Sequence, residues 1–186
     1  ALGLVWLLSA AVSRSSILVL VLAGVVVSGF FGALVSLVQF LADSQDTLPV
    51  IVFWLLGSFA TADADKVALL AGPIIGCGAV LLALRWRINI LSMGDEDARA
   101  LGVPVAGLRW LLLVLTALIV SAQVAVSGMI GWVGLVVPHL ARMLVGADHR
   151  VLLPASALLG GTFLLLVDDV ARSISASEIP LGILTA

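Results

Sequence analysis

The sequence has 186 residues, of which 62% are hydrophobic and 11% are charged, and its mean hydropathy is +1.29. A soluble domain is roughly 45–50% apolar and about 25% charged, so this chain has too little polar surface to cover itself in water. The composition excludes a soluble enzyme, a nucleic-acid-binding protein and a disordered tail. It predicts an all-α, polytopic bundle of transmembrane helices.

Both ends of the sequence lie inside apolar stretches. The chain begins at Ala1, without the basic start and cleavage site of a signal peptide, and it stops at Ala186 within another apolar run. We therefore expect an internal fragment of a longer membrane subunit. No repeat or linker divides the sequence, so residues 1–186 are expected to form a single transmembrane domain.

The first half of the sequence contains two expected spans and one shorter apolar run. Ile17 to Ala42 is free of charge and exceeds the roughly 20 residues that a spanning helix needs. Leu48 to Ala62 is too short to cross comfortably and is flanked by aspartates, which favours a re-entrant or interfacial helix. Lys66 to Leu84 crosses and ends at the basic cluster Arg85–Arg87.

The apolar run from Trp110 to Ala141 has 32 residues, which is too long for one pass. Three glycines from Gly128 to Gly134 lie in its middle, where a chain can turn. We divide the run into a span, Trp110 to Ser127, and a shorter helix, Gly131 to Val145.

The distribution of basic residues predicts which ends face the cytoplasm. Val151 to Val167 crosses again, and Ile179 to Ala186 begins a last span. Cytoplasmic loops accumulate Lys and Arg, and with these spans Lys66 and Arg172 share one side. The side that we expect to be cytoplasmic carries Arg14, Arg85, Arg87, Arg99, Arg109, Arg142 and Arg150.

The predicted cytoplasmic loop from Ile88 to Arg109 carries the signals of a short helix. Ser92, followed three residues later by Asp95, is similar to a capping box. The acidic run Asp95–Asp97 suits the first turn, where the helix dipole favours negative charge.

The same loop also carries signals that end this helix. Gly102 is the expected stop residue, and Pro104 prevents the helix from resuming. We expect about two turns of helix, a bend, and a second short helix from Val105 into the next span. A polar, rigid loop of this kind, from Ser92 to Gly102, suits docking onto a soluble partner. The spacing alone fits a well-capped surface loop equally well.

Several collinear motifs resemble the vitamin B12 and iron-siderophore class of ABC importer permeases, which is the FecCD/BtuC-like family. The match keeps the family's order and spacing over nearly the whole sequence. The motifs are Leu22–Gly24, Val52–Ser58, Gly94–Gly102, Ser127–Arg142, Asp148–Ser156 and Glu178–Ala186.

The resemblance implies a ten-helix permease subunit in the bacterial inner membrane, and the chain would run from the end of helix four into helix ten. The run Leu48 to Ala62 would be a periplasmic half-helix. The implied partners are a cytoplasmic ATPase dimer, a periplasmic or lipid-anchored substrate-binding protein, and a second permease copy or a paralogous subunit.

ATP and Mg would belong to the partner ATPase, because this sequence has no GxxxxGK[ST] phosphate loop. We expect the subunit to be a transporter component rather than an enzyme, without a cofactor, a catalytic residue or a metal site of its own. His139 and His149 lack a third convergent metal ligand.

The resemblance also implies roles for individual residues. Arg172 would dock carboxylates of the binding protein, and the alternative is an i, i+4 ion pair with Asp168. The segment expected to insert into the ATPase cleft consists of Glu96, Ala98, Arg99, Ala100, Leu101, Gly102 and Val103. The expected translocation pathway includes Ser28, Gly32, Ser36, Trp54, Gly57 and Ser58.

Two alternatives stay open at this point. The small residues at Ser28, Gly32 and Ser36 also suit close helix packing, which is the commoner use of such a stripe. A proton-coupled secondary transporter could use Asp168 and Asp169 as its relay. The polar loop from Ser92 to Gly102 favours the importer, because a self-contained transporter has no need of it. The expected cargo is an iron-siderophore, with haem, cobalamin or molybdate as alternatives.

Overall fold

The computed structural model describes residues 3–4, 17–174 and 179–185, and the structural statements below concern only these ranges. Arg14, Glu178 and most of the opening apolar stretch lie outside them. The chain divides into two compact units, Ala1–Val52 and Phe53–Ala186, which we describe separately. All elements in the described ranges are helices, so the predicted all-α class is confirmed.

Within the residues that the structure describes, four helices are long and apolar enough to cross a membrane. Each contains or closely matches one of the complete spans expected from the sequence. Their bounds are α2 (Ile17–Leu41), α4 (Ala64–Ala83), α7 (Val105–Ser127) and α9 (His149–Ile174).

Helix α9 continues beyond both predicted ends, so Asp168 and Arg172 are helical residues. Helix α4 begins where the Asp63 carboxylate accepts a 2.8 Å hydrogen bond from the backbone N–H of Lys66.

Two shorter apolar helices, α3 (Thr47–Leu56) and α8 (Val133–Val145), have 10 and 13 residues. At 1.5 Å per residue they are about 15 and 20 Å long, which is less than the hydrocarbon core of about 30 Å. The expectation of short helices is therefore confirmed, with two corrections to their bounds. Helix α3 ends at Leu56 rather than Ala62, and α8 begins two residues after Gly131, because Trp132 adopts a left-handed φ of 62°.

The first unit contains α2 and the beginning of α3. A turn joins the two helices, and in it the N–H of Leu48 donates a 2.9 Å hydrogen bond to the carbonyl of Asp43. Ala23 and Val27 are buried, whereas most large apolar side chains of α2 are exposed. Exposed apolar side chains along a membrane-length helix are suited to lipid or to neighbouring helices.

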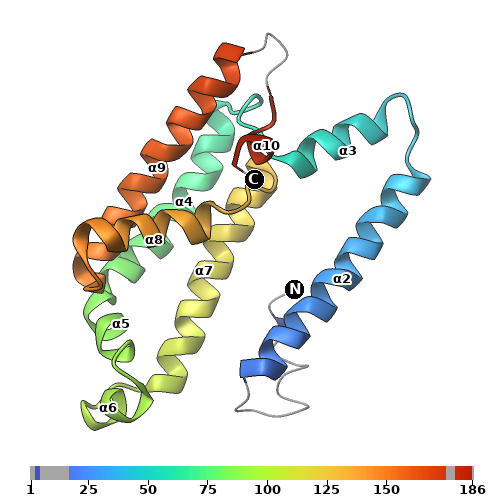
Figure 1. Cartoon of the computed structure of the whole chain (residues 1–186). Helices are drawn as coiled ribbons and strands as arrows, with labels where there is room; N and C mark the ends of the chain where they lie inside the picture. Colours follow the sequence, from blue (N-terminus) through green and yellow to red (C-terminus); the bar gives the residue numbers. More distant parts are fainter. Residues whose placement is uncertain (1–2, 5–16, 175–178, 186) are drawn as a thin grey trace. The chain divides into compact units, whose positions relative to one another are not determined.

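In the second unit, α4 packs against α7, and α8 packs against α9. Figure 1 places the start of α4 and the ends of α7 and α9 together at one end of this unit. The short helices α5 (Arg85–Leu91) and α6 (Asp95–Ala100) lie at the other end, beside the start of α7. This arrangement separates Lys66 and Arg172 from the loop that carries Arg99 and Arg109, as the predicted spans require.

Three backbones meet where α7 ends, around a junction of glycines. The N–H of Ser58 donates a 2.9 Å hydrogen bond to the carbonyl of Ser127, at the end of α7. The N–H of Leu181, at the start of α10 (Leu181–Thr185), donates a 2.8 Å bond to the carbonyl of Gly57. These bonds join the end of α3, the end of α7 and the start of α10, which Figure 1 shows close together.

The junction has no room for side chains. Gly57 and Gly128 both have a φ of +70°, and a Cβ on Gly57 would lie 2.5 Å from a carbonyl oxygen of the α7–α8 loop. A Cβ on Gly128 or Gly182 would overlap the carbonyl oxygens of Trp54 and Leu56, respectively. Gly128 therefore ends α7 as predicted, and it also lets α3 approach closely.

We predict that Gly128→Ala lowers the free energy of unfolding by more than the roughly 1–2 kcal/mol of left-handed strain, because the Cβ also meets the Trp54 carbonyl. The measurement is thermal unfolding in detergent, followed by tryptophan fluorescence. Gly134→Ala is the matched control, because Gly134 is helical and a Cβ there meets no atom within 4 Å. Equal melting temperatures for the two variants would contradict the steric role of Gly128.

Candidate functional site

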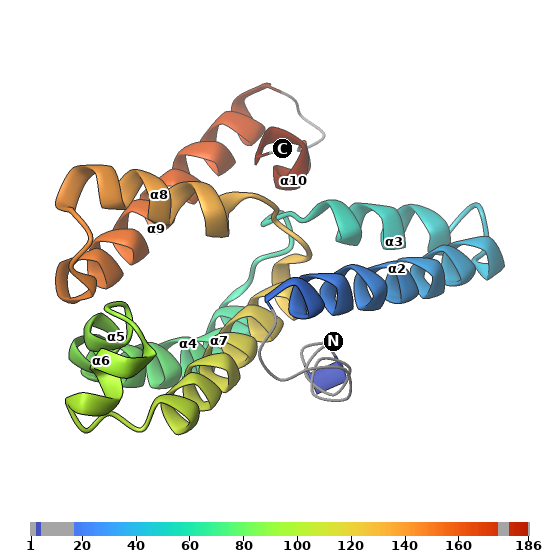
Figure 2. The ribbon, with the colours of Figure 1, turned by 60° about the horizontal axis from the view of Figure 1, so that its bottom comes forward.

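Helix α6 is a six-residue helix held between α5 and α7 (Figure 2). The sequence analysis did not predict α5. Its signal is the spacing of Leu84, Ile88 and Leu91, which lie three or four positions apart. Leu84 and Leu91 are half-buried against the apolar cluster beneath α6.

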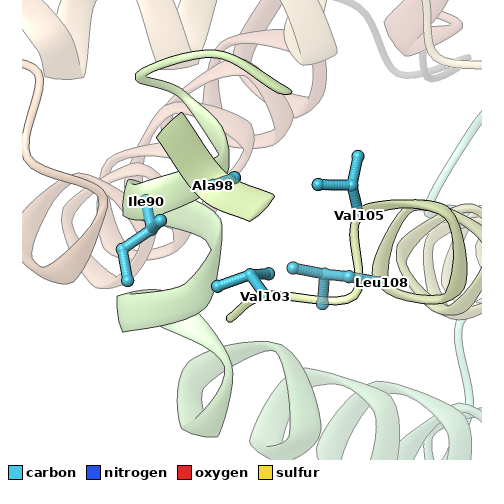
Figure 3. Close-up of a cluster of buried hydrophobic side chains, with 5 residues drawn as sticks. All are labelled: Ile90, Ala98, Val103, Val105 and Leu108. Carbon is cyan, nitrogen blue, oxygen red and sulfur yellow. The ribbon is translucent and has the colours of Figure 1, made fainter. Parts of the chain in front are cut away.

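The apolar cluster fixes α6 from below (Figure 3). Its members come from α5, from α6 and from the first turn of α7 and the loop before it. They are Ile90, Ala98, Val103, Val105 and Leu108, none of which is more than 6% exposed. Because Ala98 is completely buried, any larger side chain at that position would push α6 away from α7.

Gly102 ends α6, as the sequence predicts. Its φ is +77°, and its N–H donates a 2.9 Å hydrogen bond to the carbonyl of Arg99. The N–H of Val103 donates a 2.9 Å bond to the carbonyl of Ala98. These two bonds form a Schellman motif, and the buried side chains of Val103 and Ala98 supply its usual apolar contact.

The predicted capping box is wrong. Residue Gly94 precedes α6 with a φ of 126°, and no side chain caps the helix. The Ser92 hydroxyl instead donates a 2.7 Å hydrogen bond to the carbonyl of Asn89, at the end of α5. Ser92 is the C-cap of α5, so α6 begins at Asp95, and its six residues make about 1.7 turns at 3.6 residues per turn, close to the expected two turns.

The carboxylate of Asp95 pairs with α7 instead of capping α6. Its Oδ1 and Oδ2 accept hydrogen bonds of 2.6 and 2.9 Å from Nη2 and Nη1 of Arg109. Arg99 lies farther from the same carboxylate, at 3.7 Å. The sequence analysis missed the pair with Arg109 because the two residues are 14 positions apart, beyond any helical spacing.

The structure divides the expected coupling residues into two groups. Ala98 and Val103 are buried and hold α6 in place. Leu101 is 58% exposed. The exposed group, which is free to meet a partner, consists of Glu96, Arg99, Ala100, Leu101 and Gly102.

Helix α5 is also joined to the start of α9. The backbone N–H of His149 donates a 3.0 Å hydrogen bond to Oδ1 of Asn89, and its Nδ1 lies 3.3 Å from the same oxygen. Nη1 of Arg85 donates a 3.3 Å bond to the carbonyl of Arg150. These contacts bring together Arg85 and Arg150, two of the basic residues that were predicted to lie on the cytoplasmic side.

At the opposite end of the second unit, Arg172 lies in the last turn of α9. Its Nε donates a 2.9 Å hydrogen bond to Oδ2 of Asp168, so the ion pair considered as an alternative is present. The Arg172 side chain is nevertheless 46% exposed. Docking by this residue stays a prediction.

The expected pathway residues lie in two different settings. Ser28, Gly32 and Ser36 are exposed along α2 in the first unit. In the second unit Trp54 is 44% exposed, whereas the buried Gly57 and the half-buried Ser58 belong to the glycine junction. A role for these residues in translocation stays a prediction.

The motifs at the coupling loop and the glycine junction belong to a sequence pattern that extends along the chain. Residues 1–186 match the FecCD transport family. The chain belongs to this family. The resemblance stated from the sequence is therefore confirmed, and the four long apolar helices mark the chain as a multi-pass part of a FecCD membrane protein.

Named relatives and a solved structure agree with the FecCD assignment. The chain is 53% identical over 185 residues to the molybdate import system permease protein of Haemophilus influenzae, covering 100% of this chain and 55% of that protein. It is 41% identical over 168 residues to the hemin transport system permease protein of Yersinia pestis, covering 90% of this chain and 48% of the other. The chain thus spans about half the length of the curated relatives it matches.

A solved structure of an inward-facing metal-chelate type ABC transporter is similar to this FecCD chain, with a TM-score of 0.91 and 53% sequence identity. The similarity covers 100% of this chain and 59% of that one.

Proposed function

We propose that the chain is part of the permease subunit of an ATP-binding-cassette importer, which moves a metal-containing solute across the bacterial inner membrane into the cytoplasm. The observation that carries the proposal is the whole-length match to the FecCD family, at 53% identity to a permease of an import system. The partners would be a cytoplasmic ATPase dimer, a periplasmic or lipid-anchored substrate-binding protein, and a second permease subunit. ATP and Mg would be bound by the ATPase.

Helix α6 is the proposed contact with the ATPase. Leu101 is 58% exposed and could be buried in an apolar cleft of the ATPase. Full burial of a side chain of this size stabilises a complex by roughly 1.5–3 kcal/mol. Glu96 and Arg99 precede it, are exposed and carry opposite charges, so they would orient the contact. Ala98 and Val103 anchor α6 from the other side, so a push on its exposed face would reach α7.

The residues that we propose for the pathway are the small-residue stripe of α2, in the first unit, and Trp54, in the second unit. No Asp, Glu, Lys or Arg occurs in α2, so this helix offers no fixed charge that would hold an ion tightly. Such a lining fits a permease that receives its cargo from a binding protein. Gly57 and Ser58 would act by holding the backbone that follows Trp54.

We propose molybdate as the cargo, ahead of the iron-siderophore expected from the sequence. The relative named for molybdate is 53% identical over the whole chain, whereas the relative named for hemin is 41% identical. Molybdate was among the alternatives considered from the sequence, together with haem and cobalamin.

The test of this function is uptake into proteoliposomes that contain the whole subunit, its ATPase and its binding protein. We predict that radiolabelled molybdate enters only with ATP and Mg on the ATPase side, and that a protonophore leaves the rate unchanged. Excess unlabelled ferric siderophore should not compete. Uptake driven by a pH gradient without ATP would instead support a proton relay through Asp168 and Asp169.

We predict that Gly102→Trp abolishes the stimulation of ATP hydrolysis by loaded binding protein, because the indole would occupy the exposed face of α6. A Cβ on Gly102 meets no atom within 4 Å, so the added bulk points away from the fold. Gly146→Trp is the matched control, since Gly146 is also exposed, with a φ of +84° and the same open surroundings. Normal stimulation of ATP hydrolysis in Gly102→Trp would contradict a role for α6 in the contact with the ATPase.

We predict that Arg172→Glu weakens the affinity of the permease complex for its binding protein at least tenfold at low salt, because charge reversal replaces attraction by repulsion. Asp168→Asn is the control, since it removes the ion pair at 2.9 Å and keeps the guanidinium. The measurement is binding-protein titration by surface plasmon resonance. Unchanged affinity for the binding protein in Arg172→Glu would contradict the docking role of Arg172.

A further inference from the structure

We propose that the ion pair between Asp95 and Arg109 is a positioning device that fixes the orientation of α6 on α7, so that the two helices move as one body. The proposal rests on the proposed function, because orientation matters only if α6 receives the push of the ATPase. Asp95 and Arg109 are positioning residues, since they act through the exposed residues of α6.

The geometry of this pair is suited to fixing an angle. Both terminal nitrogens of one guanidinium donate to both oxygens of one carboxylate, at 2.6 and 2.9 Å. Two parallel bonds between planar groups restrict rotation as well as distance. A lysine at position 109 would keep the attraction and lose this directional restraint.

The pair also joins two helices. The other ion pairs found within the described ranges link residues two to four positions apart, within one helix or beside its end. Asp95 opens α6, whereas Arg109 lies in the second turn of α7. Breaking this pair therefore removes a connection between elements, which loss of the other pairs would not do.

The apolar cluster alone leaves α6 free to pivot. Burial of Ala98 and Val103 holds the helix against α7, but apolar contact is non-directional. The connection between the two helices passes through Gly102, whose left-handed backbone has open surroundings. The ion pair lies at the first residue of α6, three positions before Ala98, and the Asp95 side chain is 34% exposed. The apolar contact holds α6 against α7, and the bidentate ion pair at its first residue adds the directional restraint that defines one orientation.

The experiment measures cargo transported per ATP hydrolysed in the reconstituted complex with its ATPase and binding protein. We expect Arg109→Gln and Asp95→Asn to lower this ratio about fivefold, the effect of losing one well-formed exposed ion pair, while the ATPase still copurifies. Arg109→Lys should fall in between. The exchanged pair, Asp95→Arg with Arg109→Asp, should recover part of the ratio.

Matched controls separate the pair from a general effect of charge. Asp97→Asn removes a carboxylate from the same turn, and Arg87→Gln removes an exposed guanidinium from α5; neither side chain has an ion pair among the described residues. Both controls should keep the parent ratio. The proposal is overturned if Arg109→Gln and Arg87→Gln transport the same amount of cargo per ATP.

Hydrogen exchange of the α6 amides provides a second measurement that does not depend on transport. We expect residues 95–103 to exchange about fivefold faster in Arg109→Gln, with α7 unchanged, and unaltered exchange would overturn the proposal. The Gly102→Trp variant separates the two ideas. If it stays coupled, the coupling role of α6 fails. If it uncouples and Arg109→Gln behaves as the parent in both assays, only the positioning role fails.

Discussion

The second unit depends on the close approach of three backbones at Gly57, Gly128 and Gly182. Each of these glycines faces a carbonyl oxygen at a distance that leaves no room for a Cβ. Hydrogen bonds from Ser58 and Leu181 then close the junction. In an apolar surrounding, backbone N–H and C=O groups must find such partners, because lipid offers none. The junction therefore both ends α7 and satisfies the polar groups that its ending exposes.

This constraint determines which end of the unit carries which loop. Because α7 stops at Ser127 and α8 has only 13 residues, the chain turns back before it can cross again. The start of α9 is thereby brought to α5, where Asn89 and Arg85 bond to it. An uninterrupted helix through Gly128 would carry Arg142 and Arg150 to the opposite end, away from α6.

The sequence predicted the parts of this arrangement that follow from local chemistry. A charge-free run sets the length of α2, and glycine explains the ends of α6 and α7, because few other residues adopt a positive φ at low cost. The features that the sequence did not predict, or predicted wrongly, have a different origin. Ser92 could cap α6 only if α5 ended earlier, and α5 is stabilised by burial of Ile90 in a cluster formed mostly by later residues. Spacing cannot reveal such long-range packing.

The same limit applies to the candidate site. The exposed residues of α6 could be identified from the pattern Gly94–Gly102. The apolar cluster and the ion pair that hold the helix in place could not. Asp95 lies in the first turn of α6, as predicted, whereas its pair with Arg109 depends on the position of α7, which lies beyond the bend at Pro104. The local signals in this loop predict the helix and its end, and tertiary contacts decide its orientation.

Helix α7 connects the two ends of the second unit. Its 23 residues extend about 35 Å at 1.5 Å per residue, which is enough to cross the hydrocarbon core. One end bears Arg109 and the apolar contacts of α6, and the other ends in the glycine junction with α3 and α10. Because an α-helix transmits displacement along its axis with little bending, a push on α6 would reach the backbone beside Trp54. Charged residues are scarce in this chain, and in the described ranges the pair of Asp95 with Arg109 is the one ion pair that links α7 to a neighbouring helix. Its loss would therefore leave α6 and α7 joined by apolar contacts and the backbone alone.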